Sequence, residues 1–538
     1  MKRIPCWIPV CVLGVLVAFH PTIFSGFRQM QVDPGDTRLV NYFLEHGYRW
    51  ATGQLHGSGF WNPRYFFPQQ NVLAYSETLL GVGPLYWIWR GLGMGPESSF
   101  QVWLILVSVL NFVAVFTFLK RWFVSNPWIA AVGAYLFAFG SPRINQLIHP
   151  QLLAQFFPVL ALHALGYILG AARLTRSATA KRSWLFVFFA ASVLQLYSGF
   201  YHGWFLGFCL VIGFLWSLSS RQIRARYWLL LREDWLWIAG LGLVSAVALL
   251  PLARHYQFAA GSVGVRRFDD VVSMIPPLQA WFHLGTWNLL YSWLFQIKLF
   301  KIIPLEHEQR IGIGIVSFGL VILGIYLGVR RTQKQVALKV LFLTFATLFV
   351  VFLQFNGYTL FRYIFSWFPG ASGLRGFCRV GVFLLLSHAI ALVLALDWVR
   401  KWSKQGLVVA LSLFCMTEQV VSTVSFNWRG YRRQFETVKQ AIGPRCGYFL
   451  YSPILGPDSF PGVWKYQIDA MWAQLESGVP TLNGYSGNMP PGWAMGDNLI
   501  RRSFDDARIQ SAVHWWIKKN SLIPGEYCLI RIPAGPSP

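Results

Sequence analysis

Long apolar segments alternate with short polar loops along most of this 538-residue chain. A helix needs about 20 apolar residues to cross the hydrocarbon core of a bilayer. About eleven segments approach that length: 6–25, 98–119, 126–141, 152–172, 183–199, 204–219, 235–253, 312–329, 338–354, 377–399 and 406–425. The pattern therefore predicts an α-helical polytopic membrane protein with about 11 transmembrane helices.

The segment 78–93, "TLLGVGPLYWIWRGLG", is apolar enough to count as a twelfth span. Gly81, Gly83 and Pro84 interrupt it, which favours a re-entrant or interfacial segment. Counting it as a span would reverse the side of every later loop. The alternative, in which it spans and a later segment does not, stays open at this point.

Composition supports the membrane assignment and charge gives it a direction. With 55% hydrophobic and 12% charged residues, the chain has too little polar surface for a soluble globule of this size. The net charge of +25 comes largely from short loops between apolar segments, which begin at Lys120, Arg173, Ser219, Arg330 and Arg400. Such loops face the cytoplasm, so we expect a cytoplasmic N-terminus and an extracytoplasmic C-terminal region. No basic domain rich in stacking aromatic residues stands outside the spans, which argues against nucleic acid as a partner.

The first apolar segment follows the basic start "MKRIPCW" and resembles a signal peptide. No small-residue cleavage site follows it before the polar loop, so we interpret it as an uncleaved first span.

Two acids of a chain poor in acids come directly after this first span, in "DPGDTRLVNYFLEH". Asp36 stands where a helix N-cap would be expected, and capping explains it well. Asp33 has no such structural role. A carboxylate at the membrane boundary can deprotonate or orient the hydroxyl of an acceptor, and both acids are candidates for this role.

Basic residues on the outer side run against the positive-inside bias and so indicate a specific anionic partner. The candidates are Arg143 and His149 in "SPRINQLIHPQ", and Arg375 and Arg379 in "GLRGFCR". Arginine binds phosphate through bidentate hydrogen bonds. Arg375 and Arg379 are four residues apart and would share one face of a helix. A lone loop histidine is as often solvated, and His149 stays open between the two.

Two further outer loops carry charges without a clear site. "LEHEQR", which contains Glu306, His307 and Glu308, has the composition of a metal site. Adjacent residues do not converge on one ion, so this segment would contribute only with partners elsewhere. "GVRRFDD", from Gly264, is consistent with a charged, solvated loop.

The region 426–538 has fewer long apolar segments and reads as a small extracytoplasmic α/β domain after a transmembrane domain of 1–425, whose first outer loop is 26–97. Cys446 and Cys528 lie at or in predicted strands. They would pair in an oxidising compartment, and two free thiols are the alternative. The Gly- and Pro-rich loop 480–493 carries residues able to stack on and hydrogen-bond a sugar, Asn483, Tyr485 and Trp493.

These features together resemble the GT-C superfamily of polytopic membrane glycosyltransferases, which includes protein O-mannosyltransferases, aminoarabinose transferases of lipid A and YfhO-type bacterial proteins. The residues that carry the resemblance are "GDTRL", "EHGYRW", "NVLAYSE", "PGASGLR" and "LNGYSG". The resemblance implies an enzyme of the bacterial inner membrane. It would transfer a sugar from a polyprenyl-phosphate donor to a glycan, lipid or protein acceptor outside, by an inverting displacement.

The resemblance also implies roles for residues. An acid of the first outer loop acts as base or acceptor orienter, which points to Asp33 with Asp36 as the second acid. Basic outer residues hold the donor phosphate, which points to Arg375 and Arg379 with His149 as helper and Arg143 nearby. Glu77 offers another acid near the 78–93 segment and joins Asn483, Tyr485 and Trp493 as an acceptor-binding candidate. Metal dependence varies within the superfamily; no metal site stands out, and a divalent metal is one option.

Three other readings compete with a transferase. A transporter or flippase of lipid-linked sugars predicts ionisable residues in mid-membrane and related halves, and the sequence shows few of the former and no clear duplication. An O-antigen polymerase or ligase would carry its polar loop late in the chain. A non-catalytic envelope-assembly scaffold would leave the C-terminal domain as the working part.

Overall fold

A computed structural model describes residues 5–55, 57, 59–169, 177–331, 336–454, 463–496 and 506–533. The basic loops that begin at Arg173 and Arg330 lie partly outside these residues.

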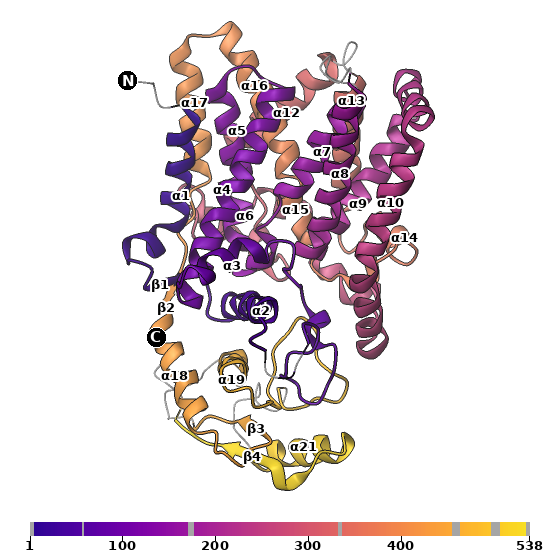
Figure 1. Ribbon diagram of the computed structural model, residues 1–538. Coiled ribbons are helices and arrows are strands. Elements are labelled where there is room, and N and C mark those ends of the chain that lie inside the picture. Colours follow the sequence, from indigo (N-terminus) through magenta and orange to yellow (C-terminus); the bar gives the residue numbers. More distant parts are fainter. Residues whose placement is uncertain are drawn as a thin grey trace.

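Apolar helices stand side by side and form most of the molecule (Figure 1). They are α1 (Trp7–Phe24), α4 (Pro96–Trp122), α5 (Pro127–Phe139), α7 (Phe156–Ile168), α8 (Ala178–Ser198), α9 (Phe200–Ser217), α10 (Arg221–Val263), α12 (Ile315–Arg331), α13 (Val336–Val351), α16 (Leu385–Trp402) and α17 (Gln405–Glu418). Each of the predicted spans coincides with one of them. Within the described residues, 6 are long and apolar enough to cross a membrane, and α12, α13 and α17 are shorter apolar helices. The fold class is confirmed, and the count of eleven crossings stays a prediction.

The centre of the bundle is the segment Phe377–Trp402, where α16 follows the short α15 (Val380–Phe383). In the most apolar stretch of this segment 89% of the residues are buried, against 6% in that of α10. The long α10 therefore forms an edge, and its apolar side chains face the surroundings of the protein, as lipid-facing side chains do.

The ambiguous segment 78–93 forms only a short helix, α3 (Gly83–Gly91, 9 residues). A helix of that length is about 14 Å long, whereas the hydrocarbon core is about 30 Å thick. As the interrupting glycines and proline predict, this segment is not a membrane-spanning helix.

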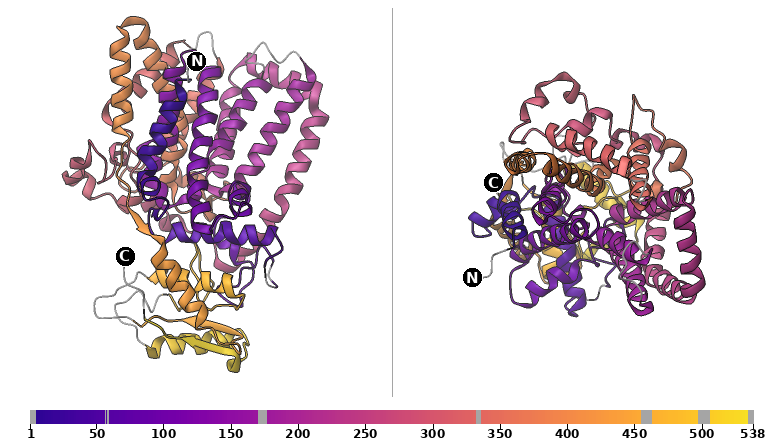
Figure 2. Two further views of the ribbon diagram at one scale, coloured as in Figure 1. Left: turned by 60° about the vertical axis from the view of Figure 1, so that its left-hand side comes forward. Right: turned by 90° about the horizontal axis from the view of Figure 1, so that it is seen from above.

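One end of the bundle carries the elements that build the site. Helix α2 (Asp36–Ala51) lies across this end, and the C-terminal elements lie beyond it, while the turn between α16 and α17 lies at the other end (Figure 1; Figure 2). Strand β1 (Gln29–Gln31) pairs antiparallel with β2 (Ser425–Asn427), which ties the start of the first loop to the start of the C-terminal region. Short helices complete the connections: α6 (Ser141–Asn145), α11 (Lys298–Lys301) and α14 (Arg362–Phe365).

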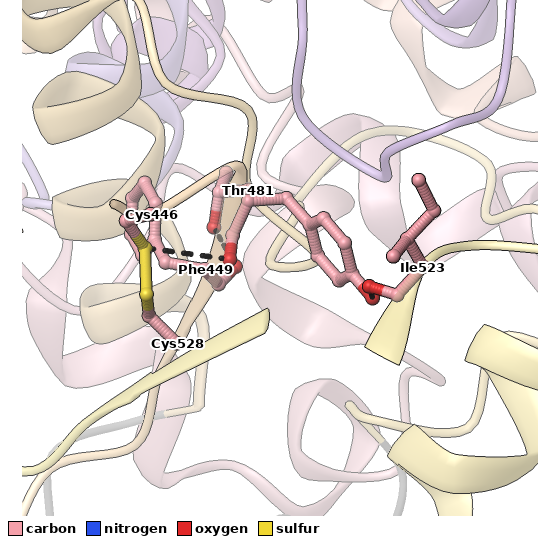
Figure 3. Close-up of a disulfide and its surroundings, with 6 residues drawn as sticks. Cys446, Phe449, Thr481, Ile523 and Cys528 are labelled. Atoms are coloured by element: carbon pink, nitrogen blue, oxygen red, sulfur yellow. Dashed lines mark hydrogen bonds between the residues drawn. A yellow bond between two sulfur atoms is a disulfide. The ribbon is translucent and has the colours of Figure 1, made fainter. Parts of the chain in front are cut away.

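The C-terminal region is α/β, as its composition predicts. It contains α18 (Trp428–Gln440), β3 (Tyr448–Tyr451), α19 (Val463–Ser477), α21 (Asp506–Lys519) and β4 (Tyr527–Ile530). Strands β3 and β4 pair in parallel, and a disulfide between Cys446 and Cys528 links them (Figure 3). The structure thus selects the disulfide over two free thiols.

The first outer loop packs directly on this region. The backbone N–H of Phe66 donates to the carbonyl of Asn483 at 2.8 Å. The backbone N–H of Thr481 donates to the backbone carbonyl of Arg64 at 2.9 Å. Arg38 of α2 forms a buried ion pair with Asp469 of α19. The C-terminal region and the first loop therefore form one packed layer at the end of the bundle.

Candidate functional site

Three side chains from distant parts of the chain form a row at the end of the bundle that carries α2. Asp36 opens α2, His149 lies between two short 3-10 helices, and Glu308 ends another. His149 Nδ1 lies 2.7 Å from Asp36 Oδ2, and His149 Nε2 lies 2.9 Å from Glu308 Oε1. Their side chains are only 18%, 13% and 6% exposed, in the order Asp36, His149, Glu308. The row is therefore a shielded ionic cluster.

The cluster fixes the charges of its members. Burial lowers the pKa of His149, but hydrogen bonds to Asp36 and Glu308 outweigh this effect and raise the pKa to about 9. Burial raises the pKa of Glu308, but the bond from His149 brings it down to about 2. The pKa of Asp36 is likewise lowered, because His149 and Tyr485 outweigh its burial. At neutral pH the row is an imidazolium between two carboxylates.

The two acids of "DPGD" have different tasks from those the sequence suggests. The N-cap of α2 is Gly35, no side chain caps this end, and the carboxylate of Asp36 bonds His149 and Tyr485 instead. The capping prediction for Asp36 is wrong. Asp33 is the residue that shapes the turn, because its Oδ1 accepts the N–H of Gly35 at 2.7 Å.

Asp33 is also the stronger base of the pair. Burial raises its pKa, the bond from Gly35 lowers it in part, and the negative charge of neighbouring Asp36 raises it further. A carboxylate with a raised pKa accepts a proton more readily than one with a lowered pKa.

The C-terminal region contributes directly to this cluster. The hydroxyl of Tyr485, in the loop after α19, donates to Asp36 Oδ1 at 3.0 Å. Tyr485 was expected to stack on an acceptor sugar, and the structure places its hydroxyl on the carboxylate.

Arg379 is a buried cation beside the cluster. It ends the 3-10 helix Phe377–Arg379, is 8% exposed, and lies with its guanidinium carbon 4.2 Å from the centre of the Tyr201 ring. Its charge acts on Asp36, Glu308 and Glu77. Across the part of the chain that the structure describes, no acceptor reaches its buried Nε and no carboxylate forms an ion pair with it. Buried donors are almost always bonded, so this one indicates an absent acceptor.

Arg375 lies close by but not on a shared helix face, because the short helix begins only at Phe377. The expectation of a shared helical face is therefore wrong. The backbone N–H groups of Arg375 and Gly376 donate to the Tyr201 hydroxyl at 3.2 and 3.0 Å, and the Arg375 side chain is exposed. Tyr201 thus holds both arginines, one by its ring and one by its hydroxyl.

Glu77 is a further carboxyl group that interacts electrostatically with Arg379. Its Oε2 accepts the N–H of Phe200 at 2.7 Å, at the start of α9. Burial raises its pKa to about 7, against the lowering effects of the Phe200 bond and of Arg379. This carboxyl group therefore changes charge close to neutral pH.

Three sequence candidates do not join the site. Arg143 is 1% exposed and bonds the carbonyls of Phe137 and Leu153 and the side chain of Gln155. Asn483 bonds the backbone of Tyr451 on both sides, and the indole of Trp493 donates to the carbonyl of Leu482. All three are buried inside the protein, so we leave them out of the proposed site.

Arg266 interacts with the candidate site, although its sequence context predicts only a charged, solvated loop. Its Nη2 donates to Asn488 Oδ1 at 2.9 Å, and its pKa is lowered by burial and by the positive charge of Arg375. Only the fold reveals this neighbour, because the two arginines are more than 100 residues apart. Glu308 bonds a residue of a distant loop, His149, rather than a neighbour in its own segment.

The cluster does not have the arrangement of a metal site. Among the residues that the structure describes, no three His, Cys, Asp or Glu side chains converge on a point where they could hold an ion. Asp36, His149 and Glu308 form a line, in which both ring nitrogens of His149 already face carboxylates.

Comparison with solved structures gives the fold a relative. The Archaeoglobus fulgidus oligosaccharyltransferase complexed with Zn and sulfate matches 95% of this chain and 67% of its own, with a TM-score of 0.52 and 12% identity. The same protein tethered to an acceptor peptide matches at a TM-score of 0.52 and 13% identity, over 96% of this chain and 68% of its own. The chain has the GT-C fold. The resemblance stated from the sequence is thereby confirmed at the level of fold.

Other comparisons add little. ArnT from Cupriavidus metallidurans bound to undecaprenyl phosphate is similar at a TM-score of 0.39 and 12% identity, covering 95% of this chain and 74% of that one. No family model and no curated protein matches the sequence. The activity of this chain therefore has to be argued from its own residues.

Proposed function

We propose that this protein is a membrane glycosyltransferase of the bacterial inner membrane. It moves a sugar from a polyprenyl-phosphate-linked donor to a cell-envelope glycan, lipid or protein on the extracytoplasmic face. The observation that carries the proposal is Arg379, whose buried Nε meets no acceptor among the described residues, next to a carboxylate cluster at one end of the helical bundle. The tethered acceptor peptide of the oligosaccharyltransferase supports transfer to an acceptor.

The reaction is a displacement at the anomeric carbon, with inversion. The acceptor oxygen forms a bond to this carbon as the bond to the donor phosphate oxygen breaks, and the acceptor proton passes to a carboxylate. We assign the proton to Asp33, because its raised pKa makes it the better base. Asp36 holds the imidazolium of His149 in place, which keeps positive charge beside the reacting groups.

The leaving phosphate gains negative charge as the bond breaks. Arg379 lies in a buried environment, where its charge interacts more strongly than in water. Arg375 lies at the exposed side of the same group, where a lipid phosphate would enter from the membrane surface. Binding by guanidinium groups both positions the donor and stabilises the leaving group.

Zinc is present in one structure of the oligosaccharyltransferase. Because Asp36, His149 and Glu308 lie in a row and not around one point, no step of the proposed reaction is assigned to a metal. Metal dependence is tested separately, by repeating the transfer assay with a chelator and then with a divalent metal added back.

The test uses the purified full-length protein in nanodiscs with a panel of radiolabelled polyprenyl-phosphate sugars. Wild type is compared with Asp33→Asn, Asp36→Asn and Arg379→Ala. Arg362→Ala is the control, because this arginine is exposed and its guanidinium stacks on the ring of Phe268. We expect donor consumption in wild type and the control, with losses of about 100-fold or more in the site variants.

Three results would contradict the proposal. Consumption that survives both aspartate substitutions would remove the carboxylates from the chemistry. Movement of intact lipid-linked sugar across the bilayer, without hydrolysis or transfer of any donor, would instead show a flippase. Failure of both transfer and movement would leave a scaffold.

A further inference from the structure

Three arginines gather around one tyrosine at the outer end of the bundle. Arg379 stacks on the Tyr201 ring, the backbone of Arg375 holds the Tyr201 hydroxyl, and Arg266 interacts electrostatically with both Tyr201 and Arg375. The three come from two segments that are far apart in sequence. The backbone N–H of Arg266 donates to the carbonyl of Ser372 at 3.0 Å, which brings the segments together.

Charges of opposite sign face each other within the row formed by Asp36, His149 and Glu308. The carboxylates of Asp36 and Glu308 face one imidazolium, His149, which leaves a single negative charge. Arg379 interacts with this cluster and compensates that charge. Glu77 beside it is only partly ionised at neutral pH, because its pKa is about 7.

The outer pair, Arg266 and Arg375, is not balanced. Neither forms an ion pair with any residue in the described ranges of the chain. Asp270 is the acid that acts on Arg266, and its effect is smaller than the repulsion from Arg375. The backbone bond from Arg266 to Ser372 brings Arg266 to the segment of Arg375, and the two positive charges repel each other. An anion bound by both would relieve that repulsion.

Arg266 is also held in place. Its side chain is half-buried and bonded to Asn488, and the Asn488 amide in turn reaches the carbonyl of Tyr75 at 3.5 Å. A guanidinium bonded through one nitrogen keeps other N–H groups free for a second acceptor. This anchoring distinguishes Arg266 from its neighbour Arg267, which is exposed and pairs with Asp269.

We propose that the site is built for a diphosphate, with one phosphoryl group at Arg379 and the second between Arg266 and Arg375. A sugar linked to a polyprenyl monophosphate carries one negative charge at its phosphate, whereas a diphosphate link carries two, and the second charge would meet the uncompensated pair Arg266 and Arg375. This inference rests on the proposed function and narrows its donor to polyprenyl-diphosphate-linked sugars. Arg266 is then the residue that distinguishes a diphosphate from a monophosphate.

The test measures binding of radiolabelled undecaprenyl-phosphate-linked and undecaprenyl-diphosphate-linked forms of one sugar to the full-length protein in nanodiscs of zwitterionic lipid. We expect wild type to bind the diphosphate at least about tenfold more tightly, and Arg266→Ala to lose most of this preference while keeping its affinity for the monophosphate. Arg375→Ala should also lose most of the preference for the diphosphate, and it serves as the second variant if Arg266→Ala does not fold. Arg267→Ala is the matched control and should keep the wild-type preference.

Equal binding of both lipids by wild type would overturn the inference, as would a loss of affinity in Arg266→Ala that is the same for both. Failure here is distinct from failure of the proposed function. Sugar transfer from monophosphate donors alone would keep the transferase and reject the diphosphate. Selective diphosphate binding without transfer from any donor would keep the site and reject the transferase.

Discussion

The hydroxyl of Tyr485 donates a hydrogen bond to Asp36 Oδ1 at 3.0 Å, although 449 residues separate the two in sequence. Asp36 opens the first helix after the first span, and Tyr485 follows α19 in the C-terminal region. The second oxygen of Asp36 faces His149. Both oxygens of this carboxylate are therefore fixed, one by the bundle and one by the C-terminal region, which makes that region part of the site.

Replacing Tyr485 by phenylalanine removes this hydrogen bond and keeps the ring. A hydrogen bond to a charged group contributes about 1.5 to 3 kcal/mol, so we expect kcat to fall about 10- to 100-fold with little change in the donor KM. Tyr358→Phe, at an exposed tyrosine, is the control. A raised acceptor KM with unchanged kcat would assign Tyr485 to acceptor binding instead.

The imidazolium of His149 predicts a basic limit to activity. Its pKa is about 9 in the folded protein, above the ordinary 6.5, so the charge is complete at neutral pH and is lost as the pH rises through about 9. Beyond that pH, Asp36 and Glu308 face each other without a cation between them. We expect kcat/KM to fall above about pH 9.

The stability of the folded state should depend on pH in the same direction as the activity. The raised pKa of His149 stabilises the folded state fully below pH 6.5, and this contribution disappears as the pH rises through about 9. In His149→Gln the alkaline decline of both activity and thermal stability should flatten, as pH profiles and thermal unfolding would show. An unchanged alkaline limb in this variant would remove His149 from that role.

The lengths of the apolar segments were sufficient to predict the helices of the bundle, but they could not predict the ionic cluster. Apolar length predicts each helix of the bundle because a bilayer imposes one length scale. The pairing of His149 with Asp36 and Glu308 depends on how three loops meet at one end, and no local spacing encodes that. Arg143 illustrates the limit from the other direction, because its sequence position resembles that of a ligand-binding arginine while its guanidinium is saturated by carbonyls.

Glu77 predicts a second pH effect, on donor binding. Its carboxyl is neutral below about pH 7 and ionised above, and it then competes with the donor phosphate for Arg379. We expect the donor KM to rise as the pH passes 7 in wild type and to stay flat in Glu77→Gln. Glu97→Gln changes another buried carboxylate, which is paired with Arg432 outside the site, and should keep the wild-type slope. A slope that persists in Glu77→Gln would contradict this assignment.

The disulfide between Cys446 and Cys528 predicts a redox-dependent stability of the C-terminal region. It closes a loop with a sequence separation of 82 residues, and a disulfide of this kind typically contributes about 2 to 4 kcal/mol. Cys446→Ser should abolish the mobility shift on reduction and lower the unfolding temperature. Cys6→Ser, at a free cysteine, is the control and should do neither. A shift that survives Cys446→Ser would show that another pair forms the bridge.

Glu45 is the centre of a buried ionic network in the first loop, which we expect to stabilise the fold. This carboxylate is fully buried and accepts hydrogen bonds from Arg49, Arg90 and Tyr86. Because Glu45→Gln leaves two guanidinium groups without a buried counter-charge, we expect a loss of about 3 to 5 kcal/mol in the free energy of unfolding. Glu476→Gln removes the half-buried second partner of Arg49 and should cost less than about 1 kcal/mol. Equal effects of the two variants in denaturant unfolding would show that the Glu45 network does not hold α2 against α3, and that the first loop draws its stability from the C-terminal region instead.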